Sequence, residues 1–115
     1  MTAATPVERL REMTAGRDAD VIVCGHTHMQ FDRMVDGVHI VNPGSVGMPY
    51  GEPGAYWALL GGDVDFWCTP YDRDSAAARI AKSSWPDAPG FARDNVLSVP
   101  SVAEAMAFMR SVGGP

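Results

Sequence analysis

The sequence has few of the features that mark several large classes of protein. Its nine lysines and arginines are scattered along 115 residues, and the net charge is −5, so nucleic-acid binding through phosphate neutralisation is not expected. No apolar run approaches the ~20 residues of a membrane span, and residues 1–20 contain no apolar stretch typical of a signal peptide. We therefore expect a cytoplasmic protein that binds neither nucleic acid nor a membrane.

Cysteine is scarce. The two cysteines, Cys24 and Cys68, lie in apolar runs without the spacing of a zinc site. We expect buried free thiols in a reducing compartment, with a single disulfide as the minor alternative. Hydrophobic residues make up 46% of the chain, which indicates a globular protein, and the length fits one domain or part of one.

The residue pattern predicts a mixed α/β fold that forms a single domain over residues 1–115. Thr5 with Glu8, and Ser101 with Glu104, have the spacing of a helix-capping box. Asp36-Gly37 is a strong signal for a hairpin turn. The predicted helices span residues 5–15, 76–82 (capped by Asp74 or Ser75) and 101–112 (ended by residues 113–115); the predicted strands span 20–24, 29–35, 38–41, 55–60 and 64–69; residues 83–90 are predicted to form a loop, and residues 91–99 are ambiguous.

The first predicted strand differs from the others because Val21–Cys24 is apolar at every position. Such a run indicates a strand that is buried on both faces, as in a parallel sheet. The later strands have the pattern of antiparallel hairpins, and the sequence contains no obvious parallel partner for the first strand. This mismatch is a first indication that part of the fold is missing.

His26 and His28 follow this strand directly after Gly25. Side chains two residues apart on an extended chain point the same way, and ligands of open α/β sheets bind at the carboxyl ends of the strands. Neutral imidazole is the commonest metal ligand near neutral pH. The pair therefore predicts metal ligands, with loop histidines of no consequence as the alternative. His39 is more simply a strand residue.

The segment 42–49 carries two glycines and two prolines and is predicted to be a loop. Its N–H groups could form an anion-binding nest, to which Asn42 and Ser45 add an amide and a hydroxyl. The alternative is a plain turn between strands. The predicted hairpin 29–41 returns this loop to the side of the histidines.

Val23-Cys24-Gly25-His26-Thr27-His28, followed by Val41-Asn42-Pro43-Gly44-Ser45-Val46-Gly47, resembles the carboxyl-terminal part of the calcineurin-like metallophosphoesterases. The small bacterial and archaeal phosphodiesterases of that family are the most similar branch. The resemblance covers residues 1–72 best, and residues 73–115 would form a helical tail. It implies part of a β-sandwich flanked by helices.

The resemblance also implies a two-metal centre that hydrolyses phosphoesters. His26 would bind one metal and His28 the other, while Asn42, Gly44 and Ser45 would lie near the substrate. Manganese is the metal we expect first, with iron, nickel and zinc as alternatives that suit imidazole and carboxylate ligands.

Most of the family's ligands have no counterpart in this sequence. The family's Asp-x-His, Gly-Asp and Asn-His motifs and a further histidine precede its Gly-His-x-His motif, but no histidine precedes His26 here. We therefore assign no catalytic residue and expect the carboxyl-terminal half of a phosphoesterase, inactive alone: a truncated gene, a fragment or one piece of a split enzyme.

Two other functions fit the same residues. The chain could be a non-catalytic module whose exposed sheet edge mediates self-association or docks a partner that carries the missing half. It could also be a small metal-binding protein that depends on the two histidines.

Overall fold

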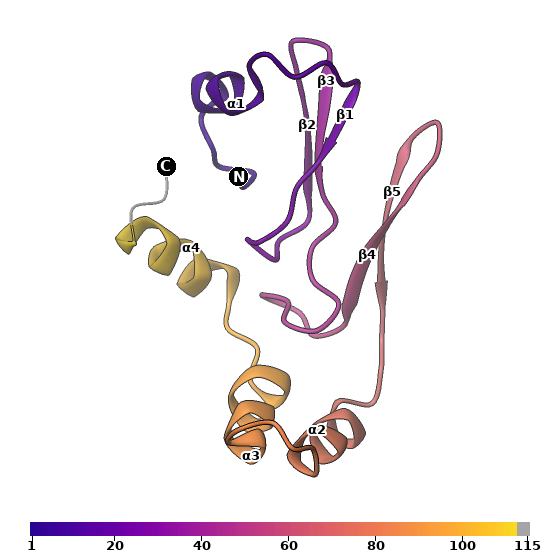
Figure 1. The fold of residues 1–115 in the computed structure, drawn as a ribbon, viewed down its shortest axis with the longest axis vertical. Coiled ribbons are helices and arrows are strands. Elements are labelled where there is room, and N and C mark those ends of the chain that lie inside the picture. The colour runs from indigo at the N-terminus through magenta and orange to yellow at the C-terminus, as the bar shows by residue number, and fades with distance from the viewer. Residues whose placement is uncertain (113–115) are drawn as a thin grey trace.

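A computed structural model describes residues 1–112 (Figure 1). It confirms the mixed α/β fold, with a three-stranded sheet, a two-stranded sheet, four α-helices and a π-helical segment in this part of the chain. The elements are α1 (Val7–Thr14), β1 (Val21–Val23), β2 (Phe31–Val35), β3 (Val38–Asn42), β4 (Ala55–Leu60), β5 (Val64–Thr69), α2 (Arg73–Ala81), α3 (Ala88–Ala92), η1 (Arg93–Leu97) and α4 (Val102–Ser111). No helix among them is long and apolar enough to cross a membrane. The predicted helix stop at 113–115 lies outside the described residues.

The three-stranded sheet has the order β1-β3-β2. β2 and β3 form the predicted hairpin, with Asp36 at φ 50° and Gly37 at φ 84°, the positive pair that a type I′ turn requires. The chain reverses its direction between β1 and β2 and again at the hairpin between β2 and β3. β3 therefore runs parallel to β1, with Val21 opposite His39. The prediction that β1 lacks a parallel partner is therefore wrong: the return strand of the hairpin is that partner.

The prediction that β1 is buried on both faces is also wrong within the described residues. Val21 is 46% exposed and Val23 53% exposed, because β1 forms an edge of its sheet and only β3 pairs with it. The core lies on the other strands, where Leu10 of α1 packs against Phe31 and Ile40. β1 therefore has the composition of a central strand at an edge position.

The start of α1 does not form the predicted capping box. Pro6 occupies the N-cap position and makes no side-chain cap. Thr5 is instead buried, and its hydroxyl accepts a hydrogen bond from the Thr2 amide at 2.8 Å. The Thr5 hydroxyl therefore stabilises the turn that precedes α1 and does not cap the helix.

β4 and β5 form an antiparallel hairpin with the predicted bounds. Figure 1 shows it as a ribbon beside the three-stranded sheet. Trp57 and Trp67 lie opposite each other, and their rings stack with centroids 5.8 Å apart. Cys68 on β5 is exposed, contrary to the expected buried thiol, and Cys24 is only half-buried; both are free, as predicted.

The helical part departs from the prediction mainly at residues 83–99. α3 and η1 form where a loop and an ambiguous stretch were predicted, and Ala92 and Val96 pack there against Ala77 of α2. Asp72, rather than Asp74 or Ser75, caps α2 by accepting from the Ser75 amide at 3.0 Å. These small apolar residues were too weakly periodic to reveal the helices.

The start of α4 confirms the second predicted capping box. The Ser101 hydroxyl accepts from the Glu104 amide, and the Glu104 carboxylate accepts from the Ser101 amide at 2.8 Å. The helix therefore begins where the sequence indicates.

The molecule exposes more surface than a compact chain of its size. Its Cα radius of gyration is 16.2 Å, against about 13 Å for a compact domain of this length. Its accessible surface is 7364 Å², against about 6,100 Å² for a folded monomer of the same mass. Figure 1 shows the reason: α1 and the three-stranded sheet lie at one end, and α2 and α3 lie at the other.

Candidate functional site

His26 and His28 lie on the loop that follows β1, at the carboxyl end of the strand as predicted. Their backbone is not extended, however: φ is 74° at His26 and 59° at His28. The argument that they share a direction because of strand alternation is therefore wrong. Left-handed conformations are uncommon in residues other than glycine, so neighbouring contacts must hold this loop in shape.

His28 has a defined orientation. Its Nδ1 lies 2.9 Å from the carbonyl oxygen of Met48, and its ring stacks on Tyr50 with centroids 5.9 Å apart. A carbonyl can only accept a hydrogen bond, so Nδ1 of the neutral imidazole carries the proton and Nε2 keeps its lone pair. A carbonyl that fixes one ring nitrogen in this way is the usual support for a metal-binding histidine.

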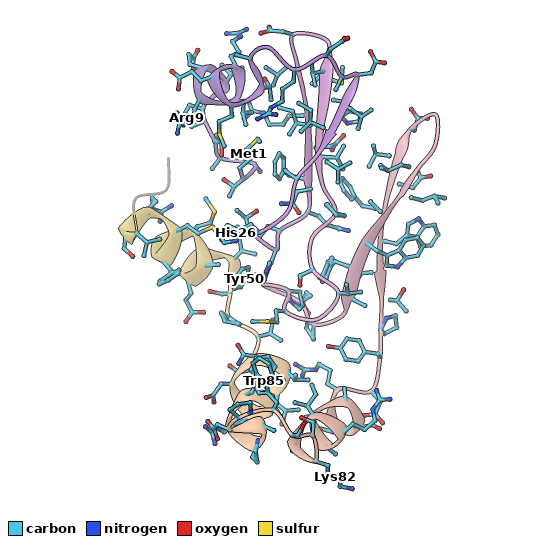
Figure 2. All side chains as sticks on the ribbon, viewed as in Figure 1. Met1, Arg9, His26, Tyr50, Lys82 and Trp85 are labelled. Carbon is cyan, nitrogen blue, oxygen red and sulfur yellow. The ribbon has the colours of Figure 1, made fainter. Side chains whose placement is uncertain are left out.

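His26 is exposed. Figure 2 labels it where the loops leave the three-stranded sheet. Its exposed imidazole can therefore bind an ion without displacing a protein contact that holds the fold.

Asn42 joins the histidine loop to the loop that follows β3. Its side chain is fully buried, and its Nδ2 donates to the Thr27 hydroxyl at 3.0 Å and to the Gly25 carbonyl at 3.3 Å. Its Oδ1 accepts from the Gly44 amide at 2.9 Å. These contacts give Asn42 a positioning role; its contact with substrate stays a prediction.

The loop between β3 and β4 is close-packed around Gly44. Its φ is +88°, and a Cβ at this position would lie 2.9 Å from Cγ of Gln30 and 2.9 Å from Cβ of Tyr56. Glycine is therefore required here by both conformation and space. Gln30 reinforces the contact, because its Nε2 donates to the Trp57 carbonyl at 3.0 Å and also reaches the carbonyls of Pro43 and Trp67.

Ser45 is connected to His28 through Met48. The Ser45 hydroxyl accepts from the Met48 amide at 3.0 Å, and the Met48 carbonyl is the atom that contacts His28. The structure thus brings the two predicted motifs together in one network. Thr27, Gln30 and Tyr50 also belong to this network, but nothing in their spacing distinguishes them in the sequence.

Tyr56 forms part of the surroundings of this network. Burial raises the pKa of its phenol, and the nearby Cys68 thiol raises it further. The phenol donates to the Glu52 carbonyl at 3.0 Å. Tyr56 therefore stays protonated at neutral pH. It packs beside the loop at Gly44 and donates a hydrogen bond.

The described residues contain no complete set of metal ligands. In residues 1–112, no group of three or more histidine, cysteine or carboxylate side chains lies close enough to hold an ion. His39 pairs with Asp32 at 2.8 Å across β2 and β3. Imidazole is a suitable ligand for a transition metal, and the role of His26 and His28 as metal ligands stays a prediction.

Residues 2–63 match the family model of the calcineurin-like phosphoesterase superfamily domain, which spans more than half of the chain. Among curated proteins, none matches the chain. Among solved structures, the crystal structure of a hypothetical protein from Pyrococcus horikoshii has a similar fold, with a TM-score of 0.65 and 21% sequence identity. The similarity covers 80% of this chain but only 39% of that chain.

Proposed function

This chain belongs to the calcineurin-like phosphoesterase superfamily, and we propose that it contributes His26 and His28 to a two-metal centre that hydrolyses phosphoesters. The observation that carries the proposal is the hydrogen bond from His28 Nδ1 to the Met48 carbonyl at 2.9 Å. It leaves Nε2 of the neutral ring as the atom available to an ion.

The roles of the residues follow from their contacts. When bound, two divalent ions would provide a hydroxide nucleophile and stabilise charge on the phosphoryl oxygens. His28 and His26 would each hold one ion, and manganese, iron, nickel or zinc suits imidazole ligands. Asn42 keeps the histidine loop and the loop at 43–54 in register. Gly44 and Ser45 belong to the loop that Asn42 and Met48 connect to the histidines, and we propose that this loop lies near the phosphate.

The remaining ligands must come from residues other than those that the structure describes. Two imidazoles bind a divalent ion weakly, because they lack the bridging carboxylate that a two-metal site uses. We therefore expect that residues 1–115 alone bind manganese weakly and do not hydrolyse phosphodiesters above background.

Docking of a partner that carries those ligands is supported by the exposed surface. The accessible area of 7364 Å² exceeds that of a compact monomer by roughly 1,300 Å², and a stable protein interface hides about 800 Å² on each side. Part of this surface is the open edge of β1, directly before His26. Self-association through the same edge is the alternative.

A manganese titration of three proteins tests the metal-binding part. The wild-type chain should bind manganese, the double variant His26→Ala/His28→Ala should lose that binding, and His39→Ala should keep it within twofold. His39→Ala is the matched control because it removes an imidazole that pairs with Asp32. Equal binding by the wild type and the double variant would overturn the assignment of these ligands.

The second measurement is hydrolysis of bis(4-nitrophenyl) phosphate with manganese. Background rates are expected from the isolated chain. Repeated turnover that disappears in the double variant would instead show a complete centre. Size-exclusion chromatography at several concentrations then separates a self-associating chain from a monomer that needs a different partner.

A further inference from the structure

A cavity of about 410 Å³ opens beside His28. Small-molecule sites span roughly 300–1,000 Å³, and an apolar cavity of about 150 Å³ is large enough for benzene. Its lining includes the aromatic residues His28, Tyr50 and Tyr56, and α4 contributes Val102 and Met106. The space therefore accommodates a group of one or two aromatic rings.

The chemistry of the lining favours an uncharged occupant. No aspartate, glutamate, lysine or arginine lines the cavity, and burying an unpaired charge is costly. Two of its polar groups already have partners: Gln30 Nε2 donates to backbone carbonyls, and the Thr2 amide donates to Thr5. The lining is mostly apolar and includes three aromatic residues, His28, Tyr50 and Tyr56, which favours stacking of a flat ring.

We propose that this cavity holds a flat, uncharged aromatic group of a phosphoester whose phosphate lies at the histidine loop. The proposal rests on the proposed function, because it places the phosphate at His26 and His28. His28 belongs to both parts: its ring lines the cavity, and its Nε2 is available to an ion. The cavity would thus select phosphoesters by the group attached to the phosphate.

Fluorescence titration with 2-naphthyl phosphate tests the cavity. Met106→Trp should fill it and weaken binding at least tenfold, because Met106 lines it from α4. Phe108→Trp is the matched control, since Phe108 lies on the same helix, does not line the cavity and is 65% exposed; it should change binding less than twofold. Ala4→Phe is a second blocking variant at an exposed lining position, should Met106→Trp fail to fold.

Two further ligands test the chemical class. Inorganic phosphate should bind at least tenfold more weakly than 2-naphthyl phosphate, and so should hexyl phosphate, which has an apolar group without a ring. If hexyl phosphate binds more tightly, the aromatic assignment is overturned. If Met106→Trp and Phe108→Trp change binding equally, the location is overturned.

Metal-free 2-naphthol separates this proposal from the proposed function. Binding of 2-naphthol that is lost in Met106→Trp supports the cavity without any ion or phosphate. If manganese binds in a histidine-dependent way but fails to strengthen binding of 2-naphthyl phosphate in the wild type, the placement of the phosphate is overturned; if manganese binding does not depend on the histidines, the metal-centre function is overturned, while the aromatic site stands in both cases. If manganese binding depends on the histidines but 2-naphthol does not bind, the cavity proposal alone fails.

Discussion

Gly44→Ala is the sharpest structural test of the loop that supports the histidines. The added methyl group would lie 2.9 Å from Cγ of Gln30 and 2.9 Å from Cβ of Tyr56, closer than carbon atoms pack. The backbone at φ +88° is also a conformation that alanine resists. The substitution therefore forces a shift of the loop or of the Gln30 side chain.

The expected loss of stability is a sum of two terms. A left-handed conformation costs a residue other than glycine about 1–2 kcal/mol, and overpacking costs about 1–3 kcal/mol. The free energy of unfolding should therefore fall by roughly 2–5 kcal/mol, out of a total of about 5–15 kcal/mol for a typical domain. Movement of Gln30 would add to this loss, because its Nε2 connects β4 and β5 to the loop.

Urea unfolding followed by circular dichroism measures this change, and Gly47→Ala is its matched control in the same loop. A Cβ at Gly47 would have no heavy atom within 4 Å, and its φ lies outside the left-handed region. Alanine at such a position stabilises a protein by about 0.4–1 kcal/mol through the unfolded chain. The reasoning is refuted if the two variants shift the unfolding midpoint equally.

Three further predictions concern separate residues. Asn42→Asp should lower the free energy of unfolding by about 1–3 kcal/mol in thermal melts, because it removes the buried Nδ2 donor; equal stability would contradict the positioning role. Glu104→Gln should lower the melting temperature at pH 7 but not at pH 2. Hydrogen bonds from Ser101 hold the pKa of Glu104 below its usual value, so their stabilisation is present above the unfolded pKa of about 4.3 and disappears as the pH falls through the lower folded pKa; the same difference at both pH values would refute this. Burial raises the pKa of the Cys24 thiol, so a thiol reagent at pH 8 should modify Cys24 in Cys68→Ser more slowly than Cys68 in Cys24→Ser; equal rates would refute that order.

The parts of the fold that the sequence predicts well depend on neighbouring residues. Asp36-Gly37 determines its turn because only a few residues adopt two consecutive positive φ angles. Ser101 and Glu104 cap α4 through contacts three residues apart. The bounds of β4 and β5 follow from apolar runs that flank glycines. In each case the information lies within a few residues of the element.

The parts that were not predicted depend on distant residues. Thr5 has a capping-box pattern, but its hydroxyl bonds the Thr2 amide instead. His28 has its orientation because of Met48 and Tyr50, 20 and 22 positions away in the sequence. A strand pattern cannot show such contacts. It placed the histidines correctly at the carboxyl end of β1, but its argument about the direction of their side chains was wrong.

The open edge of β1 lies directly before the histidine loop that we propose binds metal. Val21 and Val23 are about half exposed on that edge, and burying a valine fully is worth about 1.5–3 kcal/mol. A partner strand parallel to β1 would cover the edge and would place the residues after its own carboxyl end beside His26. Two copies of this chain paired symmetrically through β1 would run antiparallel, with their histidine loops at opposite ends of the paired strands. A symmetric dimer would thus hide the valines without assembling a metal centre, so manganese affinity that rises with dimerisation would contradict this geometry.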